Sequence, residues 1–432
     1  MRHTRFRLYL IALMLMTLPV SAQQRQLGVN LSWVNDYANM FVFVDAFKAS
    51  RPWISHRPSD DTWDSEVPFD VDEHGWVRSL QPDQHAGTLM LTGNGDQYPS
   101  GEYLCLYEGE GEIHFDWDAQ IVSQEPGRIV FSVQQEIGIH MVIESTNPDN
   151  YIRNIRVIMP GFETVYETQP FHPTYVDFLR NFSMFRFMDW GQTVESPPGV
   201  WAQRTTTASA TQASLKGVAL EYMIEIANTV GANAWFNVPQ TATDDYVAQM
   251  AQLIRDQLRP DLKAYIEYSN EVWNPSFSAN AYAREQGLAL GLDGDPYIAA
   301  LRFHSQRSVE VFNIFEREFG STSRIVRVMG AQVDGEPGAS EWFAQQVLDW
   351  QNAFEKTDAY AVAPYFGWFM GTPEFADQFA SMSVETVLDS ATADMRRILT
   401  ASESLVSMLN ERNVELVTYE AGQGMVIFIL NI

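Results

Sequence analysis

The second half of the chain switches repeatedly between two hydrophobic patterns. Short runs of consecutive apolar residues predict buried strands, and longer stretches with apolar residues every three or four positions predict amphipathic helices. Strands that alternate with helices indicate βα units, and therefore a parallel sheet. The predicted strands are 26–34, 181–188, 234–238, 264–270, 324–329, 359–365 and 414–419.

The helical stretches fall between these strands. Eight βα units close a barrel, so seven predicted strands leave the barrel one strand short. We therefore expect an α/β fold, a (β/α)8 TIM barrel truncated after its seventh strand. The predicted helices are 215–230, 244–258, 296–319, 341–354 and 393–413, and the apolar segment 42–47 begins a further one.

The expectation that the barrel is truncated rests on the position of the last residue. Ile432 lies twelve residues past Glu420, whereas an eighth strand with its helices needs about 50 residues in an ordinary barrel. The alternative is that Met425–Leu430 forms a short strand of its own. That segment lies too close to the strand 414–419 to be joined to it by a parallel crossover.

Residues 60–160 have a different pattern, with several short alternating runs separated by Gly- and Asn-rich turn signals. This spacing is typical of an antiparallel β-sandwich. We expect an inserted all-β sandwich domain there, between the start of the barrel at 23–59 and its remainder at 161–432. The predicted strands are 88–91, 101–107, 112–116, 128–133, 140–144 and 152–159.

The N-terminus predicts export from the cell. Basic residues precede an apolar stretch too short to span a membrane, and Val20-Ser21-Ala22 offers small residues for cleavage. We expect a signal peptide at 1–22 and a secreted protein, extracellular or periplasmic; the alternative is a membrane anchor. Cys105, the single cysteine, excludes an intramolecular disulfide and is expected to be buried.

Composition narrows the class of partner. The net charge is −27, which disfavours nucleic acid and anionic membranes but not neutral polysaccharides. Aromatic residues make up 13% of the chain and include twelve Trp, which fits stacking on sugar rings and fits a large core equally well. We expect a polysaccharide or oligosaccharide as the partner; the sequence does not indicate an oligomeric state.

Two glutamates stand where predicted strands stop. Glu271 follows the strand 264–270, and Glu420 follows the strand 414–419. Barrel enzymes carry their catalytic groups at the carboxyl ends of the strands, and the fourth and seventh strands face each other across the mouth. Two facing carboxylates are what glycosidic bond cleavage requires, and a separation of about 5–5.5 Å would give the retaining reaction.

These motifs resemble those of the clan A retaining glycoside hydrolases, the superfamily of cellulase-like barrels with catalytic groups on strands four and seven. The resemblance covers residues 26–50 and 170–424. It implies that Glu271, after Asn270, is the acid/base and that Glu420 is the nucleophile. It further implies that Asn270 binds the sugar 2-hydroxyl.

Further candidates lie at strand ends. Arg186 would hold Glu420 ionised, and the resemblance implies that Tyr365 hydrogen-bonds Glu420; the alternatives are an ordinary salt bridge and a rim aromatic. Trp273, Trp368 and Trp190 are candidates for sugar stacking, whereas Trp235 lies inside a predicted strand and is expected in the core. Gln240 stands where some clan relatives carry a substrate-side His.

Metal chemistry has no support in the sequence. The acidic cluster at 60–72 and the segment Asp293-Gly294-Asp295 lack the full spacing of a calcium loop. The histidines have no metal-ligand spacing, so we expect no metal and no cofactor. The leading hypothesis is a hydrolase of β-linked polysaccharide, and the alternatives are a non-catalytic carbohydrate-binding protein or an inactive truncated hydrolase.

Overall fold

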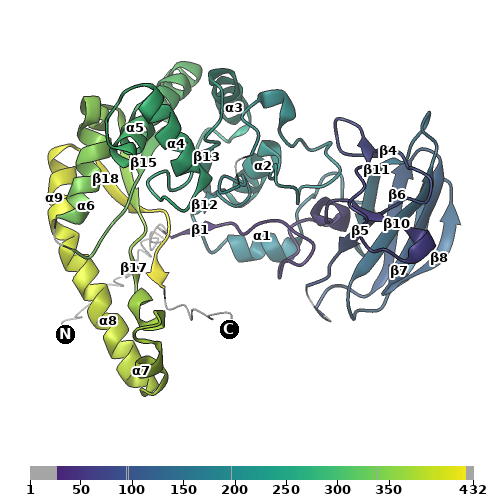
Figure 1. The fold of residues 1–432 in the computed structure, drawn as a ribbon. Coiled ribbons are helices and arrows are strands. Elements are labelled where there is room, and N and C mark those ends of the chain that lie inside the picture. The colour runs from purple at the N-terminus through teal and green to yellow at the C-terminus, as the bar shows by residue number, and fades with distance from the viewer. Residues whose placement is uncertain (1–26, 94, 96, 196, 337, 425–432) are drawn as a thin grey trace, which may run out of the picture.

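The computed structural model describes residues 27–93, 95, 97–195, 197–336 and 338–424. Figure 1 shows two antiparallel sheets at one end of the molecule and a parallel sheet wrapped by helices at the other. The predicted signal peptide and the segment Met425–Leu430 lie outside the described residues. Within those residues no helix is both long and apolar enough to cross a membrane.

The parallel sheet has seven strands among the described residues, and their order in space is their order in the chain. This confirms the predicted succession of βα units. The strands are β1 (Gly28–Asn30), β12 (Met184–Arg186), β13 (Asn233–Val238), β14 (Ala264–Tyr268), β15 (Ile325–Gly330), β16 (Ala359–Val362) and β18 (Glu415–Thr418).

The parallel sheet curls until its two edge strands approach each other. Seven strands spaced about 4.8 Å apart would separate the edges of a flat sheet by roughly 29 Å. Instead, Asn30 at the end of β1 donates its Nδ2 to the carbonyl oxygen of Tyr419, just past β18, at 3.0 Å. The carboxyl ends of the strands therefore surround one mouth, although a closed barrel is not seen among the described residues.

Alternation along the strands separates two cores. Phe185, Phe236 and Ile266 face outward and are buried beneath the helices. Their sequence neighbours Met184, Trp235 and Tyr265 face the inside of the curl. The covering helices are α1 (Pro173–Leu179), α2 (Leu220–Val230), α3 (Asp244–Gln257), α4 (Ser278–Ala289), α5 (Pro296–Phe319), α6 (Ala339–Ala344) and α9 (Glu403–Glu411), whereas α7 (Ala376–Ala380) and α8 (Val384–Ala401) extend away from the sheet (Figure 1).

The antiparallel part consists of two four-stranded sheets that share one core, as a sandwich does. Phe115 and Phe131, one from each sheet, stack with ring centroids 4.2 Å apart, and Cys105 is buried beside them, as predicted. The domain boundaries remain a prediction. One sheet has the order β2 (Ile54–His56), β5 (His85–Met90), β10 (Ile139–Thr146), β7 (Gly111–Trp117), and the other has β11 (Arg153–Ile158), β6 (Gly101–Glu108), β9 (Arg128–Val133), β8 (Ala119–Glu125); β3 (Asp70–Val71) and β4 (Val77–Ser79) form a small ribbon.

Predicted and observed elements differ at several places. Segment 42–47 does not begin an α-helix; only the 3₁₀ turn η1 (Ala46–Ala49) forms, because Phe43 is held in a bridge to Phe171. Helix 341–354 is broken, since Gln351 and Asn352 take positive φ. The strand β8 was not predicted; its burial pattern shows why, because only its first residue, Ala119, is buried.

Candidate active site

Arg186 is the centre of the mouth formed by the parallel strands. It ends β12, faces the inside of the curl and is 3% exposed. Its Nη2 donates to Glu267 Oε2 at 2.9 Å and to Asn270 Oδ1 at 3.0 Å. Its Nη1 donates to Asn30 Oδ1 at 3.2 Å and reaches Glu420 Oε1 at 3.5 Å. One guanidinium thus links four side chains: Asn30 of β1, Glu267 of β14, Asn270 just beyond β14, and Glu420 just beyond β18.

The principal partner of Arg186 is Glu267, a residue that the sequence did not single out. Glu267 lies on β14 and is 2% exposed. Its carboxylate also accepts from Trp235 Nε1 at 2.9 Å and Asn237 Nδ2 at 2.8 Å. Burial raises the pKa of the Glu267 carboxyl, and the charge of Arg186 opposes that rise. The only signal in the sequence was an acidic residue inside an otherwise apolar strand.

Glu271 lies just beyond β14 and is held by two donors. Its Oε1 accepts from the Tyr419 hydroxyl, and its Oε2 accepts from Asn274 Nδ2, both at 2.8 Å. The backbone around it is strained, since Ser269 has φ 59° and Glu271 has φ 41°. Such conformations cost about 1–3 kcal/mol each in non-glycine residues and concentrate at functional sites. The strained turn aims the Glu271 carboxylate toward Tyr419.

Glu420 follows β18 and contacts two of the predicted residues. The Tyr365 hydroxyl donates to Glu420 Oε2, and Arg186 approaches the other carboxylate oxygen. Tyr365 is the first residue of β17 (Tyr365–Phe366), which pairs with β19 (Gly422–Gln423) and so holds the two segments side by side. The structure thus brings Tyr365 and Arg186 to Glu420, and the roles expected of these residues stay predictions.

The two glutamates belong to one electrostatic neighbourhood. Burial raises the pKa of the Tyr365 phenol, and the negative charges of Glu420 and Glu271 raise it further. Burial and the charge of Glu271 likewise raise the pKa of Tyr419. Both phenols therefore stay protonated and serve as hydrogen-bond donors. Burial and the charge of Glu420 also raise the pKa of Asp189, a further carboxyl group at this mouth.

Tyr419 was not singled out from the sequence, yet it joins the two glutamates. Its hydroxyl binds Glu271, and its backbone leads directly into Glu420. Its ring also lies 4.9 Å from the Arg186 guanidinium carbon, within range of a cation–π contact. Its position next to Glu420 in the sequence indicated that Tyr419 lies near the site. Strand alternation alone, however, does not show which tyrosine reaches which carboxylate.

The expected sugar-stacking aromatics are not equivalent. Trp190 is 0% exposed and packs on Phe187 at 5.6 Å between ring centroids, so its assignment to sugar stacking was wrong. It turns beneath the outer face of the sheet, where an indole gains more by burial. Trp368 is 55% exposed at the start of η6 (Trp368–Gly371). Trp273 is half-buried, with its ring edge toward Phe343.

Trp368 and Trp273 remain predictions as substrate contacts, as does Asn270. Asn270 is 3% exposed, with its Oδ1 engaged by Arg186. Trp235 is 3% exposed and lies in the interior core, as predicted. Gln240 is buried, and its Nε2 donates to Ser278 Oγ at 3.1 Å.

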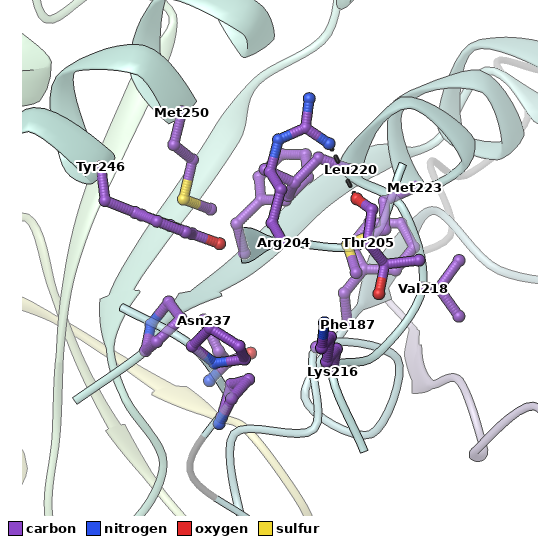
Figure 2. Close-up of a pocket in the computed structure, with 15 residues that line it drawn as sticks. Phe187, Arg204, Thr205, Lys216, Val218, Leu220, Met223, Asn237, Tyr246 and Met250 are labelled. Carbon is purple, nitrogen blue, oxygen red and sulfur yellow. Dashed lines mark hydrogen bonds between the residues drawn. The ribbon is translucent and has the colours of Figure 1, made fainter. Parts of the chain in front are cut away.

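A separate pocket lies beside this mouth, between the sheet and helices α2 and α3. Figure 2 shows apolar side chains such as Tyr246 and Met250 around it, together with Arg204. Arg204 is engaged by Glu221, with Nη2 to Oε1 at 2.7 Å. Neither Glu271 nor Glu420 lines this pocket. The candidate active site is therefore the ring of polar groups around Arg186, not this neighbouring hollow.

The residues of this mouth suit proton transfer and nucleophilic attack more than metal binding. Over the part of the chain that the structure describes, no group of three or more His, Cys, Asp or Glu side chains is placed to hold a metal ion. The carboxylates of Glu267, Glu271 and Glu420 converge instead with two phenol donors and one guanidinium. This set can stabilise one carboxylate and supply or accept a proton at another.

Comparison with known proteins does not assign the chain to a family. No family model matches it, and no curated protein matches. A family 51 α-L-arabinofuranosidase from Bifidobacterium longum is 15% identical at a TM-score of 0.37, over 59% of this chain and 49% of that one. This chain thus spans about half the length of that enzyme.

Two other solved structures are similarly distant. The CBM22-1–GH10 modules of the Clostridium thermocellum endo-1,4-β-D-xylanase 10B, complexed with xylohexaose, are 9% identical at a TM-score of 0.37, covering 91% of this chain and 92% of that one. A β-glucuronidase from Ruminococcus gnavus is 14% identical at a TM-score of 0.25, and the likeness covers 80% of this chain and 52% of that one. All three TM-scores lie below 0.5, so these likenesses show no shared family or activity.

Proposed function

We propose that this protein is a retaining glycoside hydrolase that cleaves β-linked polysaccharide. The observation that carries the proposal is the link between the two glutamates. Tyr419 binds Glu271 and leads into Glu420, while the phenol of Tyr365 lies in the field of both carboxylates. Two carboxyl groups converging on one mouth are what a double displacement at an anomeric carbon requires.

The proposed roles follow from the contacts of each carboxylate. Glu420 accepts a hydrogen bond from Tyr365 and is approached by Arg186, and these two donors hold its carboxylate in place as the nucleophile. It attacks the anomeric carbon, the bond to the leaving oxygen breaks, and Glu271 gives that oxygen a proton. A water then loses a proton to Glu271 and displaces Glu420 from the sugar.

The setting proposed for this reaction is outside the cytoplasm. The pattern of residues 1–22 predicts secretion, and polymeric substrates are met outside the cell. The expected partner is a neutral β-linked polysaccharide or an oligosaccharide derived from it.

The direct test is reducing-sugar release from a panel of β-linked polysaccharides. Glu420→Gln and Glu271→Gln should each lose activity, by on the order of 10⁴-fold for a nucleophile. Glu415→Gln is the matched control, because Glu415 is an exposed glutamate at the start of the same strand, β18. Hydrolysis retained in Glu420→Gln would remove that residue as the nucleophile.

Azide separates the two roles. In Glu420→Ala, azide should attack from the vacated nucleophile side and give an α-glycosyl azide. In Glu271→Ala, it should intercept the glycosyl-enzyme and give a β-glycosyl azide, as the two-step reaction requires. An inverted first product from the wild-type protein, seen by NMR, would exclude the double displacement. Sugar binding without any hydrolysis would favour the non-catalytic alternative.

A further inference from the structure

Two exposed indoles lie together on the antiparallel part of the protein, far in sequence from the glutamates. Trp63 lies in the loop after η2 (Pro58–Asp60), and Trp117 ends β7. They are 45% and 40% exposed. Their ring planes are 9° apart, with centroids separated by 6.1 Å. We call this pair the Trp63–Trp117 platform.

The platform is built on two histidines of the neighbouring strands. The His140 ring lies 5.1 Å from Trp63 and 5.5 Å from Trp117, between ring centroids. Nε2 of His140 is 3.0 Å from Nε2 of His56, whose Nδ1 binds the Trp63 carbonyl oxygen at 2.5 Å. A Cβ at Gly87 would lie 1.9 Å from His56 Nε2, so the absence of a side chain there makes room for the histidine pair.

Core packing does not explain the platform. The core of the two sheets is on the opposite side of β7 and β10, where Phe115 and Met141 are buried. Trp117 also has φ 62°. A bulky residue in that conformation is a true outlier with a strained backbone. The fold thus tolerates strain at Trp117 while leaving its indole, which would gain by burial, in contact with solvent.

Hydrogen-bonding groups border the platform. His114 and Asp116 lie on β7, with Nε2 to Oδ1 at 2.8 Å, and Asp116 Oδ2 is 3.6 Å from His140 Nδ1. Each side chain is about half exposed in the His114–Asp116 pair. Flat apolar faces bordered by donors and acceptors match a sugar ring, which has C–H faces and hydroxyls at its edge.

Charge decides against a polyanion. The chain carries −27, and acidic Asp60, Asp61 and Asp64 lie in the same segment as Trp63. Burial and the neighbouring His56 lower the pKa of His140 to about 4, so this imidazole is neutral near pH 7. His140 therefore adds no positive charge that would attract a nucleic acid or an acidic polymer, and the acidic side chains near Trp63 do not repel a neutral ligand.

We propose that the Trp63–Trp117 platform is a second carbohydrate-binding site, which stacks the sugar rings of a neutral polysaccharide on its indoles. It would hold polymer to the protein without taking part in bond cleavage. Its binding does not depend on the proposed roles of Glu271 and Glu420, so either proposal can fail while the other stands.

The test uses the full chain with both Glu271→Gln and Glu420→Gln, so that no ligand is consumed. Calorimetric titration with cellohexaose, xylohexaose and mannohexaose should reveal saturable binding to at least one of them. Trp63→Ala and Trp117→Ala should each weaken the platform's binding event at least tenfold. Phe178→Ala is the matched control, an aromatic on α1 that is 42% exposed and outside the platform; it should leave binding unchanged.

A conservative variant and an activity assay complete the test. Trp63→Phe keeps an aromatic face and should restore part of the affinity lost in Trp63→Ala, with unchanged thermal unfolding in both variants. Activity of the wild-type glutamate pair on a short soluble substrate should be insensitive to Trp63→Ala. The proposal is overturned if none of the three hexasaccharides binds, or if the Trp63→Ala/Trp117→Ala protein binds as tightly as its parent.

Discussion

The Tyr419 hydroxyl donates a hydrogen bond to Oε1 of Glu271 at 2.8 Å. This bond ties the residue that precedes Glu420 to the other glutamate of the mouth. The same residue closes the curl of the sheet, because its carbonyl oxygen accepts from Asn30 at 3.0 Å. One tyrosine thus couples the shape of the sheet to the placement of both carboxylates.

Replacing Tyr419 with Phe should lower kcat about 10- to 100-fold if the proposed reaction holds. A hydrogen bond to a charged group contributes about 1.5–3 kcal/mol, and this one orients the acid/base carboxylate. The ring, and its contact with Arg186, would remain. Steady-state kinetics together with thermal unfolding measure the effect.

The control for that change is Tyr360→Phe. Tyr360 is a buried tyrosine on β16, and its hydroxyl has no hydrogen-bond partner among the described residues. Its removal should leave kcat unchanged and should not destabilise the fold. Equal losses of kcat in the two variants would mean that Tyr419 acts through general packing and not through its hydroxyl.

Glu267→Ala should destabilise the protein by about 3–5 kcal/mol, because it leaves the buried Arg186 charge without its main partner. The two side chains are 2% and 3% exposed. Urea unfolding of the purified protein measures the loss. Asp60→Ala, which breaks the exposed pair with Arg57, should leave the free energy of unfolding nearly unchanged.

The double variant Arg186→Met/Glu267→Leu tests whether the loss comes from an orphaned charge. Removing both charges together should recover much of the stability lost in Glu267→Ala. It should not restore hydrolysis, because Glu420 and Asn270 would also lose Arg186. Full recovery of activity would show that Arg186 has no part in the reaction.

Ser269→Gly should stabilise the fold by about 1 kcal/mol, since glycine accepts positive φ without strain. Ser269 is 0% exposed with φ 59°, and its Oγ has no partner among the described residues. Chemical denaturation measures the gain. The matched change Ser308→Gly, within helix α5, should instead destabilise. A loss of stability in Ser269→Gly would mean that its backbone is not strained.

Acid should weaken the fold through His304. This residue is 1% exposed on α5, and burial lowers its pKa to about 4. The folded pKa lies below the unfolded value of about 6.5, so between pH 6.5 and 4 only the unfolded chain takes up the proton. Stability from this group is complete above pH 6.5, and about 3 kcal/mol is lost as pH falls to 4.

His304→Gln removes this titration while keeping a donor for the Gly330 carbonyl oxygen, which His304 Nε2 approaches at 2.9 Å. The difference in unfolding free energy between wild type and variant should change with pH only across the window from 6.5 to 4. Comparing the two proteins cancels other groups, such as His140. A pH-independent difference would show that His304 does not titrate as described.

Local pattern was enough to predict the strand framework and the position of the glutamates. The seven parallel strands follow from apolar runs, and α5 begins at Pro296 and ends at Phe319 where its periodicity does. The breaks at Gln351 and Asn352 could not be predicted, because each depends on packing against distant residues. The prediction that Trp190 stacks on sugar was wrong for the same reason, since a position in a loop does not show which way an indole side chain points.

The amino-acid sequence was sufficient to predict the alternation of strands and helices, the group of antiparallel strands, and the placement of Glu271 and Glu420 at strand ends. These features depend on hydrophobic periodicity, which is a local property of the chain. The folded structure was needed to show that Arg186 is shared between Glu267 and Glu420, and that Tyr419 reaches Glu271. It was also needed to show that Trp63 and Trp117 lie side by side. These pairings join residues far apart in sequence, so they are fixed by the curl of one sheet and the register of another.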